Sequence, residues 1–300
     1  MQVYNTKVSV IMPTYNRCNA LRLTLMGFKA QDFKNFEIVI VNDGGSEEAG
    51  FVVKEFKETL NIQYYSIKSI GRAGARNFAL KKAKGRYIIF NDDDRIPDNS
   101  FVREHYQTLI NRPDRVIIGH KKNISVNSFD KICDESNLEL EKWSLGDTED
   151  NRPIVYQYLG NELANFKLGW VIATTANLSY DRNGVENIWF DEQYIGWGVE
   201  DNDFAYELYR KGRQFLYLPD CVNYHVMHEK NGNYWEECKK NIILFCQKYD
   251  NLEVYLYAAV VNEIIYLKDA QEILLQIEKS PELETSLYKV FKYCEMEIGK

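Results

Sequence analysis

Three consecutive aspartates, Asp92, Asp93 and Asp94, are the residues of this 300-residue chain whose type and spacing point most directly to chemistry. They follow the apolar run Tyr87 to Phe90, which is typical of a buried central strand. Hard divalent ions such as Mg²⁺ or Mn²⁺ neutralise clustered carboxylates and bind phosphate oxygens. In an extended segment Asp92 and Asp94 point the same way, so we expect them to hold such an ion. The alternative is a solvated acidic turn before a helix.

Polar residues also follow two earlier apolar runs, Val8 to Met12 and Glu37 to Val41, which are typical of buried strands. Because ligands of open α/β sheets collect at the carboxyl ends of strands, we expect these residues to line one crevice with the aspartates. A single acid at such a position is more often a helix cap, but three successive strand ends carry such groups here. The residues are Pro13, Thr14, Tyr15, Arg17 and Asp43.

The segment from Gly71 to Asn77 opens a predicted helix with small residues and two arginines. Helix amino termini favour anions, and Arg76 could bind a phosphate or stabilise the aspartates. The alternative is a glycine-rich loop with surface arginines.

A second acidic segment, Gly196 to Asp203, places glycines on both sides of a tryptophan before a predicted helix. Trp197, next to Gly198, could stack on the apolar face of a sugar. Glu200 or Asp201 could accept a proton from an attacking group. An acidic first helical turn is the alternative, although it does not explain the Gly-Trp-Gly sequence.

His225 and His228 lie just beyond the predicted last strand, and either could complete a metal site with the aspartates. A structural role at the edge of the core is the alternative for both.

The elements that position these residues alternate between strand and helix, which predicts an α/β fold with a doubly wound parallel sheet. A strand is expected at Val171 to Leu178 and a polar excursion over the active face from Lys121 to Asn165. From Tyr234 the pattern becomes amphipathic helix. We therefore predict a catalytic domain, residues 1–233, and a C-terminal helical extension, residues 234–300, which most simply packs against the domain.

Composition excludes several classes of protein. A net charge of −7 argues against nucleic-acid binding. No G-x-G-x-x-G follows the first strand and no G-x-x-x-x-G-K-[ST] occurs, which disfavours nicotinamide dehydrogenases and P-loop ATPases. No apolar stretch reaches the roughly 20 residues of a membrane span. With six scattered cysteines and no signal peptide, we expect a cytoplasmic protein. Contact between the C-terminal helices and the inner face of the membrane stays open, as does a homo-oligomer formed through these helices.

The chain resembles family 2 glycosyltransferases of the GT-A fold over about residues 5 to 230. Five motifs carry the resemblance, in the family's order and spacing: Val8-Ser-Val-Ile-Met-Pro-Thr-Tyr-Asn-Arg17, Val41-Asn-Asp-Gly44, Gly71-x-x-x-Ala-Arg-Asn77, Phe90-Asn-Asp-Asp-Asp94 and Gly196-Trp-Gly-x-Glu-Asp201. The last also resembles a segment of galactosyltransferase and N-acetylhexosaminyltransferase domains. Asn42, where the family more often has aspartate, and an extra Gly45 depart from the pattern.

The resemblance implies an inverting, metal-dependent transfer of a sugar from a nucleotide-diphosphate sugar, expected to be a UDP-sugar, to a hydroxyl acceptor such as a glycan, a lipid-linked saccharide or a secondary metabolite. Asp201 would be the catalytic base, and Glu200 would bind donor or acceptor sugar. Asp92 and Asp94 would form the D-x-D pair, with Asp94 and His225 on Mn²⁺ or Mg²⁺. The Pro13 to Tyr15 loop and Asp43 would hold the nucleoside end of the donor, with Arg76 nearby. The donor site would also include Arg17, Asp92 and Asp93.

Two other functions stay open at this stage. A nucleotide-sugar-binding protein without catalysis would keep the crevice and not need Glu200 or Asp201. A sugar nucleotidyltransferase would need a glycine-rich basic loop after the first strand, and Pro13 to Arg17 contains no glycine.

Overall fold

The computed structural model describes residues 6–124, 140–146, 155–157, 160–227 and 234–298. Its centre is an eight-stranded sheet of order β3-β2-β1-β4-β7-β6-β8-β5. The strands are β1 (Val8–Thr14), β2 (Phe36–Asp43), β3 (Ile62–Ile67), β4 (Tyr87–Asn91), β5 (Arg95–Pro97), β6 (Arg115–Ile124), β7 (Asn177–Asp181) and β8 (Gln214–Val226). The strand that leads into the three aspartates, β4, therefore lies inside the sheet, between β1 and β7.

Strand direction divides the sheet into two halves. The first four strands are parallel, as expected. The expectation of a wholly parallel sheet is wrong beyond β4, because β7 runs antiparallel to both β4 and β6, and β5 runs antiparallel to β8. The strand expected at Val171 begins later: Gly169–Ile172 forms a 3-10 turn, and the Thr175 amide binds a side chain rather than a neighbouring strand. Thr174 and Thr175 thus bind Asp201 before the chain enters the sheet at Asn177.

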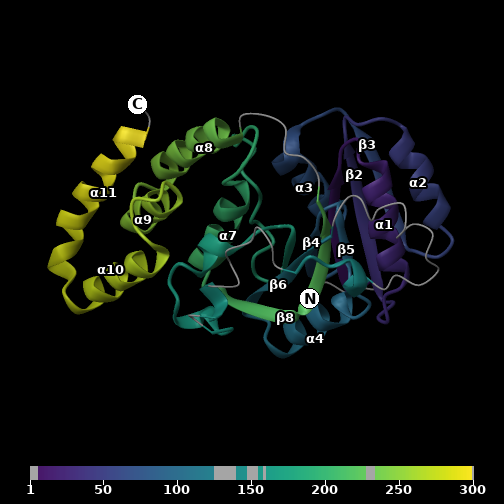
Figure 1. Ribbon diagram of the computed structural model, residues 1–300, viewed down its shortest axis with the longest axis horizontal. Helices are drawn as coiled ribbons and strands as arrows, with labels where there is room; N and C mark the ends of the chain where they lie inside the picture. Colours follow the sequence, from purple (N-terminus) through teal and green to yellow (C-terminus); the bar gives the residue numbers. More distant parts are fainter. Residues whose placement is uncertain (1–5, 125–139, 147–154, 158–159, 228–233, 299–300) are drawn as a thin grey trace.

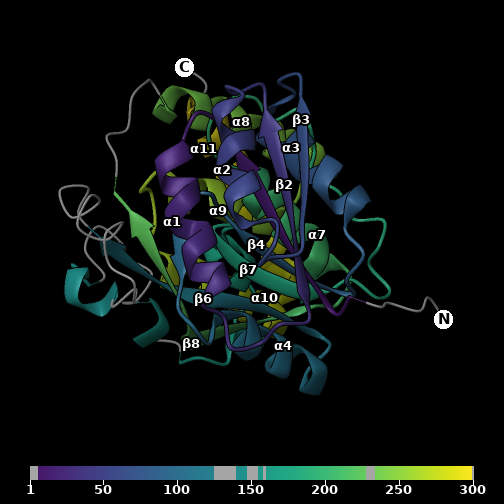
Figure 2. The ribbon, with the colours of Figure 1, turned by 90° about the vertical axis from the view of Figure 1, so that its right-hand side faces the viewer.

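Alternate side chains of the parallel strands pack into two separate hydrophobic cores, one on each face of the sheet. Val10 and Ile38 pack on the face covered by α1, α2 and α4, whereas Ile11 and Val39 pack on the face covered by α3 and α7. Figure 2 shows α1 and α2 in front of the strands. These helices are α1 (Cys18–Lys29), α2 (Glu48–Phe56), α3 (Gly71–Lys82), α4 (Phe101–Asn111) and α7 (Glu200–Arg210). Burial on both faces explains why the strands read as continuous apolar runs.

Four further helices follow the sheet and lie along one side of the molecule (Figure 1). They are α8 (Tyr234–Tyr249), α9 (Leu252–Val261), α10 (Leu267–Lys279) and α11 (Glu284–Ile298). Trp170, from the turn before β7, joins them to the sheet half: its ring centroid lies 5.8 Å from that of Phe245 and 5.2 Å from that of Tyr257. The C-terminal helices therefore share the core that covers the α3 and α7 face.

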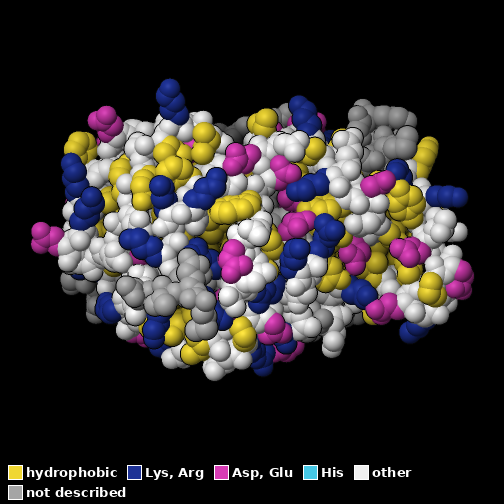
Figure 3. Space-filling model, turned by 180° about the vertical axis from the view of Figure 1, so that it is seen from behind, with side chains coloured by type: hydrophobic (Ala, Val, Ile, Leu, Met, Phe, Trp, Pro, Cys, Tyr) yellow, Lys and Arg dark blue, Asp and Glu magenta, His cyan; other side chains and the backbone are white. Residues whose placement is uncertain are grey.

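The surface shows mixed charge. On the face seen in Figure 3, lysine and arginine side chains alternate with aspartate and glutamate. Among the described residues, every helix is too short or too polar to cross a bilayer. Much of the polar excursion expected between Lys121 and Asn165 lies outside the described residues, although β6 extends through its first part to Ile124.

Candidate active site

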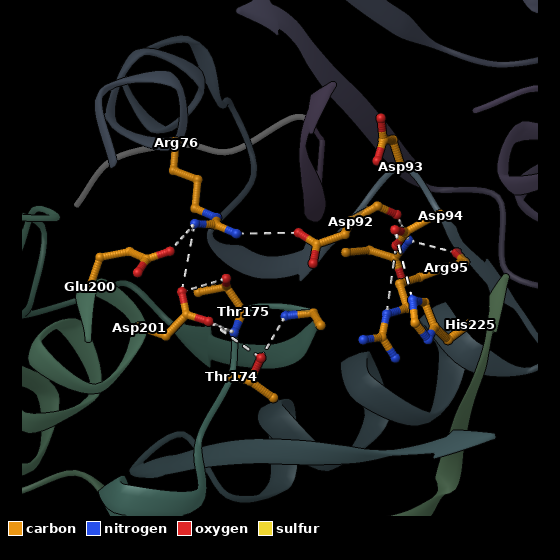
Figure 4. Close-up of polar contacts among 12 residues, drawn as sticks. Arg76, Asp92, Asp93, Asp94, Arg95, Thr174, Thr175, Glu200, Asp201 and His225 are labelled. Carbon is orange, nitrogen blue, oxygen red and sulfur yellow. Dashed lines mark hydrogen bonds and ion pairs between the residues drawn. The ribbon is translucent and has the colours of Figure 1, made fainter. Parts of the chain in front are cut away.

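The three aspartates lie in a turn rather than in an extended segment. β4 ends at Asn91, whose side-chain amide donates to the carbonyls of Asp92 and Arg95 and closes the turn. As a result Asp92 and Asp94 face different partners (Figure 4), which corrects the expectation that they point the same way. The site consequently has two parts, one around Arg76 and one around Asp94.

Arg76 lies at the centre of the first part. Its side chain is 5% exposed, and its guanidinium reaches three carboxylates: Nη2 lies 3.2 Å from Asp92, and Nη1 lies 3.3 Å from Glu200 and 3.6 Å from Asp201 (Figure 4). Burial alone would lower the pKa of Arg76, but the three carboxylates outweigh it and raise the pKa. A permanent buried cation therefore links the end of β4 to the start of α7.

Asp201 is held by the segment before β7. The Thr175 hydroxyl donates to Oδ1 at 2.7 Å, and the Thr175 amide and the Thr174 hydroxyl donate to Oδ2 at 3.1 and 3.3 Å. The Asp201 side chain is 21% exposed, so solvent still reaches it. This carboxylate combines a fixed orientation with access, which suits a group that must accept a proton from a substrate.

Glu200 is buried beside it in the first turn of α7. Burial and, secondarily, the charge of Asp201 raise the pKa of Glu200, and Arg76 opposes that rise. The helix begins at Glu200 with Val199 before it, so Asp201 lies inside the first turn of α7 and does not cap it. Val199 has a φ of 77°, a left-handed conformation that costs free energy in a β-branched residue. Such strain at the entrance to an acidic helical turn is typical of functional sites.

Trp197 and Gly198 precede Val199 at the edge of the site. The Trp197 side chain stays 40% exposed, and its ring centroid lies 5.7 Å from that of Tyr234 on α8. Gly196 and Gly198 both have positive φ, which glycine adopts without steric cost. The glycines thus allow the loop to leave an aromatic ring accessible.

Asp94 is the centre of the second part. It pairs with Arg17, and its carboxylate oxygens lie 3.8 Å from Arg95 Nε and 3.8 Å from His225 Nε2. His225 lies within β8, not beyond the last strand as expected, because that strand continues to Val226. His228 lies outside the described residues.

Whether this pair fits a divalent ion can be judged from its donor set. Two ligands bound at about 2.0–2.2 Å to one octahedral ion lie about 3 Å apart, so Asp94 and His225 would need to approach by less than about 1 Å. Among the described side chains no group of three or more carboxylate, imidazole or thiol ligands is assembled. Asp94 and His225 fit as two ligands of such an ion, and oxygen atoms of a bound substrate and of water would supply the others. Arg17 would have to share the Asp94 oxygen that it pairs with, or move away from it.

Asp93 borders the second part, because Arg17 Nη1, which pairs with Asp94, also lies 3.7 Å from the Asp93 carboxylate. It is buried, and the Thr14 hydroxyl donates to its carboxylate at 2.6 Å, while the Thr24 hydroxyl donates to its carbonyl at 2.9 Å. Burial first, and then the charge of Asp94, raise the pKa of Asp93 to about 7. Its contacts tie the turn after β4 to β1 and α1.

The loops after β1 and β2 form the remaining edge. Tyr15 is 59% exposed next to half-buried Pro13, and Asp43 accepts a hydrogen bond from the Ile70 amide at 2.7 Å. Asn42 donates to the carbonyls of Gly45 and Ser46. A Cβ on Gly45 would lie 2.4 Å from Asn42 Oδ1. The two departures from the family pattern, Asn42 and the extra Gly45, therefore pack directly against each other.

Four side chains of the site carried no recognisable sequence signal. Thr174 and Thr175 hold Asp201, and Glu237 and Asn241 of α8 bind the Gly196–Gly198 loop. Each is of a common residue type, and each meets its partner only through tertiary contact, so no local pattern marks it.

Comparison with known proteins defines the class. Residues 9–171 match the family described as Glycosyl transferase family 2, which is more than half of the chain. The chain belongs to this family. It is 28% identical to chondroitin synthase of Escherichia coli over 240 residues, 73% of this chain and 34% of that protein. It thus spans about a third of that relative.

Two solved structures are similar in fold. S. aureus TarS 1-349 in complex with UDP-GlcNAc matches with a TM-score of 0.58 and 17% identity, over 84% of this chain and 66% of that one. Mannosyltransferase PcManGT from Pyrobaculum calidifontis, in complex with GDP-Man and Mn²⁺, matches with a TM-score of 0.61 and 16% identity, over 99% and 85%. The fold is GT-A, followed by C-terminal helices.

Proposed function

We propose that this chain transfers a sugar from a nucleotide-diphosphate sugar, a UDP-sugar, to an acceptor hydroxyl with inversion at the anomeric carbon. The observation that carries the proposal is the position of Arg76 between Asp92, at the end of β4, and the Glu200 and Asp201 pair of α7. Membership of the family supports it, as do the nucleotide sugars bound to TarS and PcManGT.

In the proposed reaction the acceptor oxygen attacks the anomeric carbon from the face opposite the diphosphate. The new carbon–oxygen bond forms as the bond to the diphosphate oxygen breaks, and the nucleoside diphosphate leaves with the bonding electrons. Asp201 takes the acceptor proton, because its orientation is fixed by Thr175 and it stays open to solvent. Glu200, Trp197 and Gly198 line the sugar and acceptor side.

The donor side uses the opposite edge. The nucleoside and diphosphate would bind at the ends of β1 and β2. The residues there are Pro13, Thr14, Tyr15, Arg17 and Asp43. Asp94 and His225 would hold Mn²⁺ or Mg²⁺, which supplies Lewis-acid stabilisation of the leaving diphosphate when bound. We propose that residues 1–233 carry both substrate sites and that residues 234–300 form the helical extension.

The acceptor is proposed to be a saccharide. An exposed tryptophan beside a tyrosine offers a flat apolar face of the kind that stacks on sugar rings. The similarity to a chondroitin synthase is consistent with a growing glycan as acceptor.

A thermal-shift panel of UDP, GDP, dTDP and CDP and their common sugars, with Mn²⁺ and then with excess chelator, tests the donor side. We expect stabilisation by UDP and UDP-sugars that requires the metal. Stabilisation by UDP-sugars with no transfer or hydrolysis of any of them would favour a binding protein without catalysis. No stabilisation by any nucleotide would contradict the donor site.

A further inference from the structure

The Gly196–Val199 segment is bound by two side chains of α8. Asn241 Nδ2 donates to the carbonyls of Ile195, Trp197 and Gly198 at 3.1, 3.3 and 3.0 Å. The Trp197 amide donates to Glu237 Oε2 at 2.9 Å. Three of these four residues have positive φ angles, so the segment is neither a helix nor a strand. The side chains of α8 therefore supply hydrogen-bond partners for the Trp197 and Gly198 carbonyls and for the Trp197 amide.

The loop also lies directly on the helix surface. A Cβ on Gly196 would lie 2.5 Å from Glu237 Cδ, and one on Gly198 would lie 3.1 Å from the Cys238 sulfur. A side chain at either position would therefore displace a neighbouring α8 side chain, and both glycines also adopt positive φ. The contact fixes the distance between the loop and the helix.

A second set of contacts fixes α8 against α7. Lys248 Nζ lies 2.8 Å from Asp203, which is fully buried, and the Tyr249 hydroxyl donates to Asp203 at 2.6 Å and to Glu207 at 2.8 Å. Since Asp203 is two residues after Asp201, α8 holds the chain on both sides of the Glu200–Asp201 pair. The helix thus bridges the sugar-facing loop and the first turn of α7.

We propose that Glu237 and Asn241 are positioning residues of the transfer reaction, and this rests on the function proposed above. They hold Trp197 at the acceptor side and fix the path of the backbone into Glu200 and Asp201. Neither side chain touches the reacting atoms. The first helix of the C-terminal extension accordingly positions the acceptor site from outside it.

Asn241→Asp gives the sharpest test, because it keeps the shape of the side chain and replaces the amide that faces three carbonyls with an oxygen that cannot donate. We expect kcat/KM for p-nitrophenyl glycoside acceptors to fall by at least about tenfold, as for a lost buried hydrogen bond. The Tm rise caused by UDP and Mn²⁺ should stay unchanged. Glu237→Ala should behave likewise, and Glu237→Gln, which can still accept from the Trp197 amide, should restore activity.

Asn251→Ala is the matched control. Asn251 Oδ1 accepts from the Val254 amide at the start of α9, and its Nδ2 donates to the Tyr206 hydroxyl of α7 at 2.9 Å. Its loss therefore destabilises the same helical extension and its contact with α7 without touching the Gly196–Val199 loop. Hydrogen exchange of residues 195–199 gives a readout that does not depend on activity. We expect faster exchange in Asn241→Asp and Glu237→Ala, and exchange like that of the wild type in Glu237→Gln and Asn251→Ala.

Unchanged exchange in Asn241→Asp, or faster exchange with undiminished acceptor kcat/KM, would overturn the positioning role. So would an equal loss of acceptor kcat/KM in Asn251→Ala, which would show a general effect of destabilisation. A wild-type protein inactive with every donor and acceptor would contradict the proposed function itself, an outcome distinct from either of these.

Discussion

The Thr175 hydroxyl donates a hydrogen bond of 2.7 Å to Asp201, and the amide of the same residue donates to the other carboxylate oxygen at 3.1 Å. One residue thereby fixes both oxygens of the proposed base. Thr175 can make both bonds because it lies before the sheet, where β7 begins only at Asn177.

Thr175→Val tests this relationship. The substitution keeps the shape and the amide but removes the hydroxyl, so Asp201 loses one of its donors. We expect kcat to fall by about 10- to 100-fold, the equivalent of about 1.5–3 kcal/mol for a hydrogen bond to a charged group. Thr175→Ser, which restores the hydroxyl, should recover most of the activity; a Ser variant as impaired as the Val variant would assign the effect to packing.

Arg76→Met tests the buried cation. Removing the guanidinium leaves Asp92, Glu200 and Asp201 without their shared partner, so we expect the free energy of unfolding at pH 7 to fall by about 3–5 kcal/mol in urea titrations. The control is Arg22→Met, because Arg22 and Glu55 form a two-bond pair at the surface. Its loss should cost less than about 1 kcal/mol. Equal costs for the two variants would contradict the central role of Arg76.

His105 gives a prediction about pH and stability. It is fully buried between Ser179 and Asn177, and burial lowers its pKa to about 3. The unfolded chain has a histidine pKa of about 6.5, so below that pH the unfolded state binds a proton that the folded state excludes. Stability is therefore lost as pH falls from about 6.5 to 3, by about 2 kcal/mol at pH 5.

The matching variant is His105→Gln, which keeps polar atoms and cannot titrate. Between pH 7.5 and pH 5 the wild type should lose about 2 kcal/mol more unfolding free energy than the variant in urea titrations at both pH values. Equal losses would show that His105 protonates without cost in the folded state.

Local patterns predicted the parallel half of the fold and the residues gathered at its edge. The β-branched runs at Val8 to Met12 and Glu37 to Val41 became strands because both of their faces are buried, which the sequence shows as unbroken apolar runs. The antiparallel β7 and its late start were missed, because Thr174 and Thr175 donate to Asp201 and only tertiary contact shows it.

The candidate site residues were named from the sequence, but their arrangement was not predicted. Alternation along a strand placed Asp92 and Asp94 on one side, whereas Asn91 closes a turn that separates them. The role of α8 was out of reach of local reasoning: Asn241 lies more than 40 residues from the carbonyls that it binds, and its neighbours form an ordinary amphipathic helix.

The central claim is that Asp94 serves the donor and Asp201 serves the acceptor, and a pair of variants tests it most directly. Asp94→Ala and Asp201→Asn are each assayed for sugar transfer and for the Tm rise given by UDP with Mn²⁺. We predict that both abolish transfer and that only Asp94→Ala loses the metal-dependent rise. Equal loss of UDP binding in both variants, or transfer by Asp201→Asn at the wild-type rate, would contradict the division of roles.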